Sequence, residues 1–197
     1  MKKLLIAAAL MAAIALASPS RAIEEYLPNE EGYKWQYFGF AEYGHEMTLE
    51  SITRNTNRTI YQIEGMVEDV SGGEAQGNLK IKLRYTVTDS CLILTHNAPL
   101  MMGADFLSME LLRLPLEEGA TWTQTVTDEE GNEIELFCEI EEETDQTLTV
   151  TYSDTRSPFY HYMEFEKETG ITTFEKLYMY PEGNFEIGYT LFRPERY

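Results

Sequence analysis

The sequence has 197 residues, and its 34 acidic against 15 basic side chains give a formal net charge of −19. A surface this acidic repels the phosphates of nucleic acid and of anionic lipid headgroups, so neither is expected as a partner. The length and a hydrophobic content of 43% suit one globular domain with a substantial core.

The first residues have the pattern of a secretory signal peptide. Lys2 and Lys3 form a positively charged start, and residues 4–16 are an apolar, alanine-rich stretch too short to span a bilayer comfortably. Two small-residue cleavage sites fit, after Ala17 and after Ala22. This pattern predicts that the protein is exported.

We take residues 1–22 as the signal peptide and residues 23–197 as a single β domain. The first cysteine is Cys91, so no cysteine is available for a bacterial lipid anchor. No second apolar stretch is long enough to predict a transmembrane segment. The predicted location is therefore the periplasm or the cell exterior, without a lipid anchor.

One short phrase occurs twice, 87 positions apart. Residues 27–35 read LPNEEGYKW and residues 114–122 read LPLEEGATW, and both end on the only two tryptophans of the chain. Continued without a gap, this register places Leu49 on Leu136. The match predicts an internal duplication. Its two pseudo-repeats would span about residues 23–110 and 111–197.

Each phrase has the composition of a turn that leads into a β-strand. Proline favours an extended residue before it, glycine permits a tight turn, and tryptophan supplies a large apolar anchor. On these two openings the chain resembles a loose group of exported bacterial proteins of unknown function, whose segments open with P-L-x-x-G-x-x-W-x-Y. Tyr37 keeps the final aromatic of that motif, whereas Gln124 replaces it and Asn29 replaces the usual leucine. The resemblance implies an envelope or secreted protein and carries over no active-site residue.

The dominant hydrophobic period along the chain is two. Residues 58–67, 79–87 and 133–136 alternate in polarity and are rich in β-branched or aromatic side chains, which predicts strands with one buried face. Glycine-containing turns separate such segments, and short turns favour antiparallel neighbours. The clearest hairpin is the last one, within residues 170–192.

A helical pattern is found at residues 104–112, where Phe106, Met109 and Leu112 recur at intervals of three. We expect this segment to connect the two halves, because it lies just before the second copy of the phrase. The predicted fold is therefore all-β: antiparallel meanders from an internal duplication, forming a sandwich or a curved half-barrel, with one short helix.

Export places Cys91 and Cys138 where a disulfide can form. Cys138 lies in a run of alternating polarity that directs its side chain into the core. The direction of the Cys91 side chain is ambiguous, because it lies in a continuous apolar stretch. Two interpretations remain open, a disulfide or two buried free thiols. The absence of a C-x-x-C spacing argues against a zinc or thioredoxin-like site.

The sequence contains no catalytic signature. His45, His96 and His161 are isolated and lack the spacing of a metal site. Carboxylates are so abundant that some pair must lie at any required separation by chance, so their number is no evidence for hydrolysis. We predict no catalytic residue, no metal and no cofactor. An enzyme would require the three histidines to meet carboxylates in a cleft.

The second half is unusually rich in aromatic residues. Strand alternation places Phe174, Tyr178 and Tyr180 on one face of their strand, and Phe185 and Tyr189 on one face of the returning strand. If these faces coincide on a curved sheet, they line an apolar concavity, whereas the alternative is ordinary core. The predicted ligand-binding residues are Tyr162, Phe174, Tyr178, Tyr180, Phe185 and Tyr189.

These observations favour a non-catalytic exported binding or interaction protein of the bacterial envelope or exterior. Its predicted partner is an apolar small molecule or another protein, and nucleic acid is excluded by charge. The alternatives are a structural interaction module with a filled core and, third, a hydrolase. A cavity lined by the second-half aromatics would favour the ligand carrier.

Overall fold

The structure is a computed structural model that describes residues 19–39, 43–69, 79–97, 106–128, 130–154, 160–180 and 183–192. Most of the predicted signal peptide therefore lies outside the described residues. The elements are α1 (Pro19–Glu24), β1 (Lys34–Gly39), β2 (Tyr43–Asn55), β3 (Arg58–Asp69), β4 (Leu79–Val87), β5 (Cys91–His96), β6 (Ser108–Arg113), β7 (Thr121–Thr127), β8 (Glu133–Glu143), β9 (Thr147–Asp154), β10 (Tyr160–Glu166), β11 (Gly170–Tyr180) and β12 (Gly183–Leu191).

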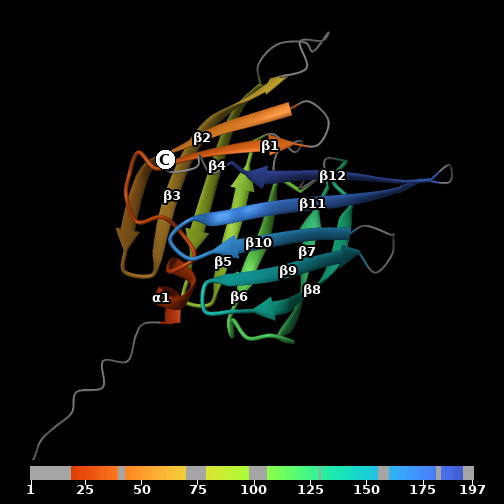
Figure 1. Cartoon of the computed structure of the whole chain (residues 1–197). Coiled ribbons are helices and arrows are strands. Elements are labelled where there is room, and N and C mark those ends of the chain that lie inside the picture. Colours follow the sequence, from red (N-terminus) through yellow and green to blue (C-terminus); the bar gives the residue numbers. More distant parts are fainter. Residues whose placement is uncertain are drawn as a thin grey trace, which may run out of the picture.

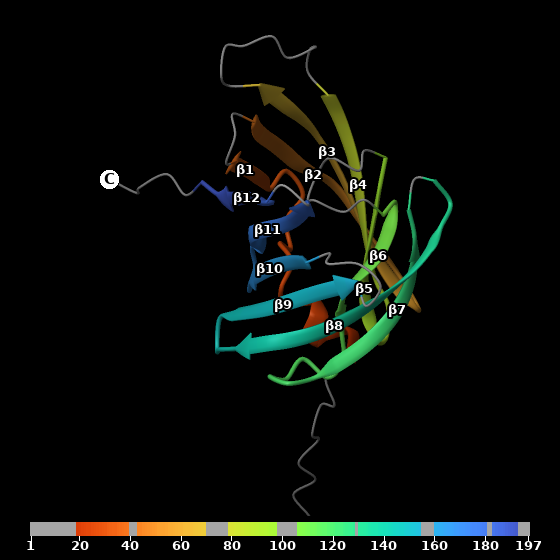
Figure 2. The ribbon, with the colours of Figure 1, turned by 90° about the vertical axis from the view of Figure 1, so that its right-hand side faces the viewer.

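The twelve strands of the described residues belong to one antiparallel sheet in the order β6-β5-β4-β3-β2-β1-β12-β11-β10-β9-β8-β7. Strands β1 to β6 and strands β7 to β12 each form a meander, and β1 pairs with β12 to join them. The sheet curls until its edges, β6 and β7, approach one another, as Figures 1 and 2 show from two sides. The predicted all-β fold of antiparallel meanders is confirmed, in the form of a nearly closed barrel.

Alternation of side chains accounts for the inside and the outside of this barrel. In β1, Trp35 and Tyr37 are buried while Lys34 and Gln36 are exposed. In β8, the buried residues are likewise every second one. The buried apolar side chains of the described strands form one continuous cluster inside the barrel. The inward face of each strand therefore supplies the core.

Helix α1 caps one end of the barrel, which we call the lower end; the opposite end, where β1 stops at Gly39, is the upper end (Figure 1). Ile23, Tyr26 and Leu27 from α1 and the segment after it are all buried in the core cluster. The backbone N–H of Glu168 donates a hydrogen bond to the carbonyl of Glu25 at 2.7 Å, which ties the β10–β11 turn to this cap.

The helix predicted at residues 104–112 is wrong. Ser108–Arg113 is strand β6, which pairs with β5, and the one helix of the described residues is α1. A β-bulge at Leu92/Ile93 shifts the pairing register of β5 and β6, and Leu111 and Leu112 are both buried. Two successive buried leucines break the strict alternation that identifies a strand.

Within the described residues, no helix is long and apolar enough to cross a membrane.

The two sequence phrases form the same local structure. Gly32 and Gly119 both have a left-handed backbone, with φ of +84° and +80°, a conformation that glycine adopts without strain. Their N–H groups donate to the carbonyls of Leu49 and Ile140, at 2.7 and 2.8 Å respectively. Leu49 is thus equivalent to Ile140, and the ungapped register that placed it on Leu136 is wrong. The second half carries four more residues between its phrase and this position.

Two junctions join the halves, and they differ in construction. The closed seam is the ladder in which Tyr37, Phe38 and Gly39 pair with Leu191, Thr190 and Tyr189. The open seam lies between β6 and β7. In the part of the chain that the structure describes, the isolated backbone bridge at this seam is Phe106 with Asp128.

Side-chain hydrogen bonds to the backbone of β6 connect the two halves at the open seam. The side-chain amide of Gln124 accepts a hydrogen bond from the Glu110 N–H at 2.7 Å and donates one to the Glu110 carbonyl at 2.8 Å. The Tyr152 hydroxyl donates to the Leu111 carbonyl at 2.6 Å. These groups satisfy backbone polar atoms that a neighbouring strand would otherwise satisfy.

Candidate functional site

The predicted aromatic residues of β11 and β12 lie in one cross-strand register. Phe174 pairs with Tyr189, Tyr178 with Phe185, and Tyr180 with Gly183. Five of the six predicted ligand-binding residues therefore belong to this one hairpin. The side chains of Tyr178, Tyr180 and Phe185 lie outside the described residues, and these three residues are placed by their backbone register alone.

Phe174 and Tyr189 are buried in the barrel and form the pair of this register that lies nearest the lower end. Their rings are stacked, with centroids 6.1 Å apart. His45 packs on Tyr189 at 4.1 Å, and His161 packs edge-on against Phe174 at 5.0 Å. A row of aromatic rings thus crosses the interior from β2 to β10.

Tyr162 does not join this row. It lies between His161 and Met163, which are both completely buried, so strand alternation puts Tyr162 on the outer face of β10. Burial is the main cause of its raised pKa, although the ring is only partly covered, and a hydrogen bond with Thr149 opposes that shift. Of the three predicted residues whose side chains the structure describes, Tyr162 lies on the opposite side of the sheet from Phe174 and Tyr189.

The β11–β12 hairpin extends beyond the strands on either side of it. Pairing of β10 with β11 ends at Tyr160 with Leu177, and pairing of β1 with β12 begins at Gly39 with Tyr189. Residues 178–180 and 183–185 consequently pair with each other alone among the described strands; we call them the arm. Figure 1 shows the arm reaching past the edge of the sheet.

A lysine lies in the same register as the aromatic row. Lys176 is only 1% exposed and pairs with His161 on one side and with Ile187 on the other. It follows Phe174 by two residues, so the two share the inward face of β11. Sequence reasoning missed Lys176. The residue lies midway between Phe174 and Tyr178, at the two-residue spacing of side chains that share one face of a strand. It is placed where the packed core ends and the arm begins.

The three histidines are all buried inside the barrel, on β2, β5 and β10. Among the described residues, no group of three histidine, cysteine or acidic side chains is arranged to hold a metal ion. Neither ring nitrogen of His45 has a hydrogen-bond partner there, and burial lowers its pKa from 6.5 to about 4. His45 is therefore a neutral packing residue at ordinary pH.

Cys91 and Cys138 are both buried and free, so the structure has two thiols and no disulfide between them. The Gln124 amide donates to the Cys138 sulfur at 3.3 Å. Burial raises the pKa of Cys138 to about 12, which leaves almost no thiolate near neutral pH. The arrangement is that of a structural thiol beside the open seam.

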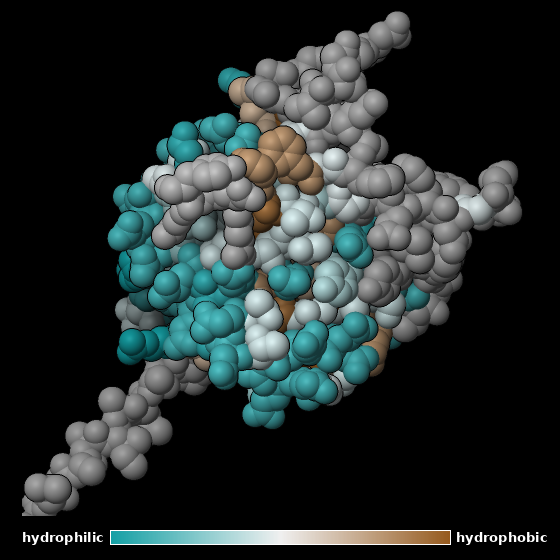
Figure 3. Space-filling view, in the orientation of Figure 1, coloured by the Kyte–Doolittle hydropathy of each residue, from teal (hydrophilic) through white to brown (hydrophobic). Residues whose placement is uncertain are grey.

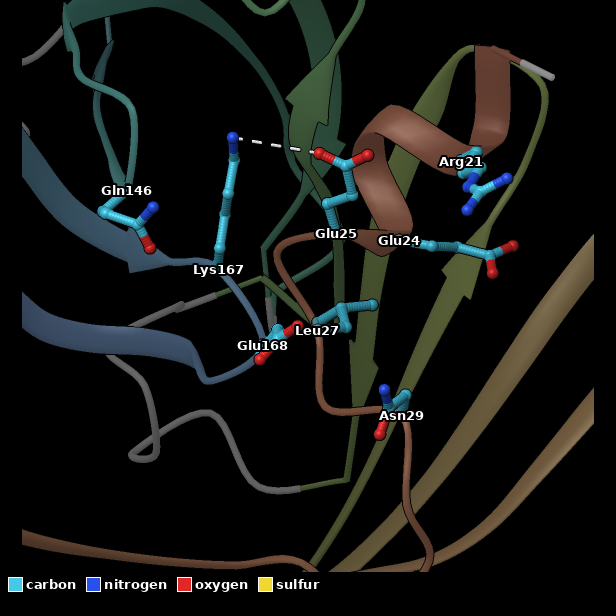
Figure 4. A pocket seen from close by; sticks show the side chains of 8 residues that line it. All are labelled: Arg21, Glu24, Glu25, Leu27, Asn29, Gln146, Lys167 and Glu168. Atoms are coloured by element: carbon cyan, nitrogen blue, oxygen red, sulfur yellow. Dashed lines mark ion pairs between the residues drawn. The ribbon is translucent and has the colours of Figure 1, made fainter. Parts of the chain in front are cut away.

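A polar cavity of about 530 Å³ lies beside α1 at the lower end (Figure 4). Leu27 is its one apolar lining residue, and the Lys167 ammonium lies 3.8 Å from the Glu25 carboxylate across it. A polar, charged lining suits water or a polar solute and does not suit the predicted apolar ligand. The lining residues are Arg21, Glu24, Glu25, Leu27, Asn29, Gln146, Lys167 and Glu168.

The outer face is largely hydrophilic, with an apolar patch over β1 and β12 in Figure 3. Phe38 and Phe192, each almost half exposed, are the large exposed hydrophobics there, and their rings meet edge to face at 5.0 Å. Phe38 is on the outward face of β1, whereas Phe174 and Tyr189 face inward. The patch is therefore separate from the aromatic row.

No protein-family model matches the sequence, and no curated protein is similar to it. Two solved structures are similar in fold. A predicted exported protein with a YmcC-like fold from Bacteroides fragilis NCTC 9343 has a TM-score of 0.52 and is 13% identical, covering 84% of this chain and 96% of its own. A predicted lipoprotein from Parabacteroides distasonis ATCC 8503 has a TM-score of 0.48 and is 10% identical, with the same coverage. The chain thus shares the overall fold of the Bacteroides fragilis protein.

Proposed function

We propose that the protein is an exported, non-catalytic binding protein of the bacterial envelope or exterior. Its ligand is an apolar molecule held against the aromatic residues of β11 and β12. The predicted signal peptide supports export, and the protein of similar fold from Bacteroides fragilis is itself described as exported. The absence of a cysteine before Cys91 argues against a lipid anchor.

The observation that carries the proposal is the continuity of the aromatic register from the core into the arm. Phe174 and Tyr189 are buried at its base, and Tyr178 pairs with Phe185 beyond the last residues of β10 and β1. A two-stranded hairpin without flanking strands is only marginally stable in water. An apolar ligand between the arm and the upper end of the barrel would bury surface that no neighbouring strand of the described residues covers.

Native mass spectrometry of the mature protein from its own host, followed by organic extraction, tests this proposal. We expect a co-purifying apolar mass. A Tyr178→Ser/Phe185→Ser double variant should lose that mass, because it removes the paired aromatics of the arm. Phe38→Ser is the matched control, since Phe38 is an exposed aromatic on the outer face. An apo mass for the wild type, or equal loss in both variants, would contradict the proposal.

The exposed Phe38–Phe192 pair favours a second candidate, a protein-interaction module. Exposed aromatic patches with polar surroundings are common at protein–protein contacts. In that case Phe38→Ser would abolish capture of a protein partner from the host envelope, and the arm variant would leave the capture intact. The two variants therefore separate the candidates.

A further inference from the structure

We infer that the signal peptide is removed after Ala17, so that the mature protein begins at Ser18 and keeps the whole of helix α1. The inference rests on the export that is part of the proposed function, and it names the site at which the precursor is processed. The sequence alone allows cleavage after Ala17 or after Ala22. The first site lies outside the described residues, whereas the second lies within them.

The second site lies inside a folded element. The Ala22–Ile23 peptide bond belongs to α1, which spans Pro19–Glu24 and lies against β4 and β5. The Arg21 carbonyl accepts a hydrogen bond from the Glu25 N–H at 3.1 Å. Cleavage after Ala22 would remove this acceptor and most of the six residues of the helix. Too few residues would then remain to form a hydrogen-bonded helical turn.

The burial of Ile23 is a second argument against cleavage after Ala22. Ile23 is 0% exposed and belongs to the core cluster. As the first residue of the mature chain, it would carry an α-ammonium group, which is mostly charged at neutral pH. A charge on a residue that is packed in the core loses part of its hydration, and this loss is costly. Cleavage after Ala17 leaves Ile23 in the interior of the chain.

The residues directly after Ile23 are fixed to the barrel at two places. The Thr59 hydroxyl of β3 donates a hydrogen bond to the Glu24 carboxylate at 2.8 Å. In the β10–β11 turn, the Glu168 N–H donates to the Glu25 carbonyl at 2.7 Å. The first residues of most domains are, in contrast, loosely held. A chain that began at Ile23 would have no such residues before these contacts.

The first site also matches the pattern of a signal peptide more closely. Residues 15–17 read Ala-Leu-Ala at the end of the apolar stretch, whereas residues 20–22 read Ser-Arg-Ala. Signal peptides typically end on a sequence of the A-x-A kind. Pro19 is the first residue of α1, a position at which proline is common. Cleavage after Ala17 therefore precedes the helix and leaves its first residue in place.

Cleavage after Ala17 keeps Arg21 in the mature protein. Arg21 lines the polar cavity beside α1, as Figure 4 shows. The other cationic side chain of this lining is Lys167, and its acidic side chains are Glu24, Glu25 and Glu168. The cavity of the mature protein therefore retains both of its cationic side chains.

N-terminal sequencing and intact mass of the protein purified from its own host test the inference. We expect Ser18 as the first residue. Ala17→Leu should stop cleavage at this bond, because the signal peptidase requires a small side chain there. Ala22→Leu is the matched control, since Ala22 is exposed, and it should be processed at Ser18 like the wild type.

The first residue found separates the inference from the proposed export. Ile23, or Met1 in protein recovered from the envelope or medium, would overturn the inference and leave export standing. Met1 in protein confined to the cytoplasm would overturn both. Processing that Ala22→Leu blocks and Ala17→Leu leaves unchanged would also overturn the inference. Because the first residue is determined on the wild type, the test does not depend on the folding of either variant.

Discussion

The closed seam and the open seam join the same two halves of the molecule by different physical means. At the closed seam, β1 and β12 share a backbone ladder from Tyr37 to Gly39. At the open seam, one glutamine amide and one tyrosine hydroxyl satisfy the backbone of β6. Ladder bonds depend on backbone conformation and tolerate changes of side chain, whereas side-chain bridges depend on single residues. Substitutions should therefore affect the two seams in different ways.

The largest effect should come from breaking the ladder of the closed seam with proline. Thr190 pairs with Phe38 on one side and with Thr173 on the other, and its side chain is exposed. Proline removes the N–H and does not fit the middle of a sheet, so Thr190→Pro should cost about 3 kcal/mol or more of unfolding free energy. Urea unfolding measures this cost. Thr190→Ala is the control, expected to change stability by less than about 1 kcal/mol; equal stability of the two variants would refute the prediction.

Acid should weaken the closed seam next, through His45. This side chain packs on Tyr189 of β12 and faces Tyr37 of β1, and burial holds its folded pKa at about 4. Below pH 6.5 the unfolded chain takes up a proton that the folded protein excludes. Folding stability should thus fall as pH drops from 6.5 to 4, by up to about 3 kcal/mol.

Unfolding free energies of wild type and His45→Phe across this pH range test the assignment. At pH 8 the imidazole is neutral in both states, so its ionisation contributes nothing there. The variant should lose stability less steeply than the wild type between pH 6.5 and 4. Parallel pH profiles would show that His45 is not the group responsible.

At the open seam, Gln124→Ala should cost about 2 kcal/mol, because it removes two hydrogen bonds to the backbone of Glu110. Hydrogen exchange of the Glu110 amide should accelerate in this variant. Gln36→Ala is the matched control, since Gln36 is an exposed glutamine on β1 at the closed seam. If both alanine variants have the same stability and the Glu110 amide stays protected, Gln124 does not hold the seam.

The smallest effect should come from a matched pair of tyrosines. The buried hydroxyls of Tyr37 and Tyr152 each donate to a backbone carbonyl at 2.6 Å, in Ile171 and Leu111 respectively. Replacing either by phenylalanine should cost about 1 kcal/mol. Only Tyr152→Phe should speed hydrogen exchange along β6, because Leu111 lies on an edge strand. The same exchange pattern in both variants would remove the distinction between the seams.

Much of the fold follows from local sequence patterns. Alternation predicted the strands and the last hairpin, since one face of each is buried. Closure of the barrel could not be predicted, because Tyr37 and Leu191 pair across almost the whole chain. The segment before Arg113 was predicted as a helix because Phe106, Met109 and Leu112 recur at intervals of three. A bulge at Leu111 of β6 removes the strict alternation that would have identified a strand there. Bulges of this kind depend on the partner strand and leave no pattern of their own.

The candidate site was predictable in part. Alternation placed Phe174 on the same face as Tyr178, and the register supports that grouping. Tyr162 was grouped with them because its neighbours in β10 are also aromatic or apolar, so alternation of polarity does not identify the inward face. Lys176 was missed because a charged residue in an alternating strand is ordinarily assigned to the solvent side.

The closed seam also determines how the molecule would respond to mechanical force. β1 begins and β12 ends at the same side of their shared ladder, where the Phe192 N–H reaches the Gln36 carbonyl. Tension applied at the start of β1 and the end of β12 would load these perpendicular bonds one after another, as in a zipper. The junction that tolerates changes of side chain would therefore separate under a small force applied at these two points.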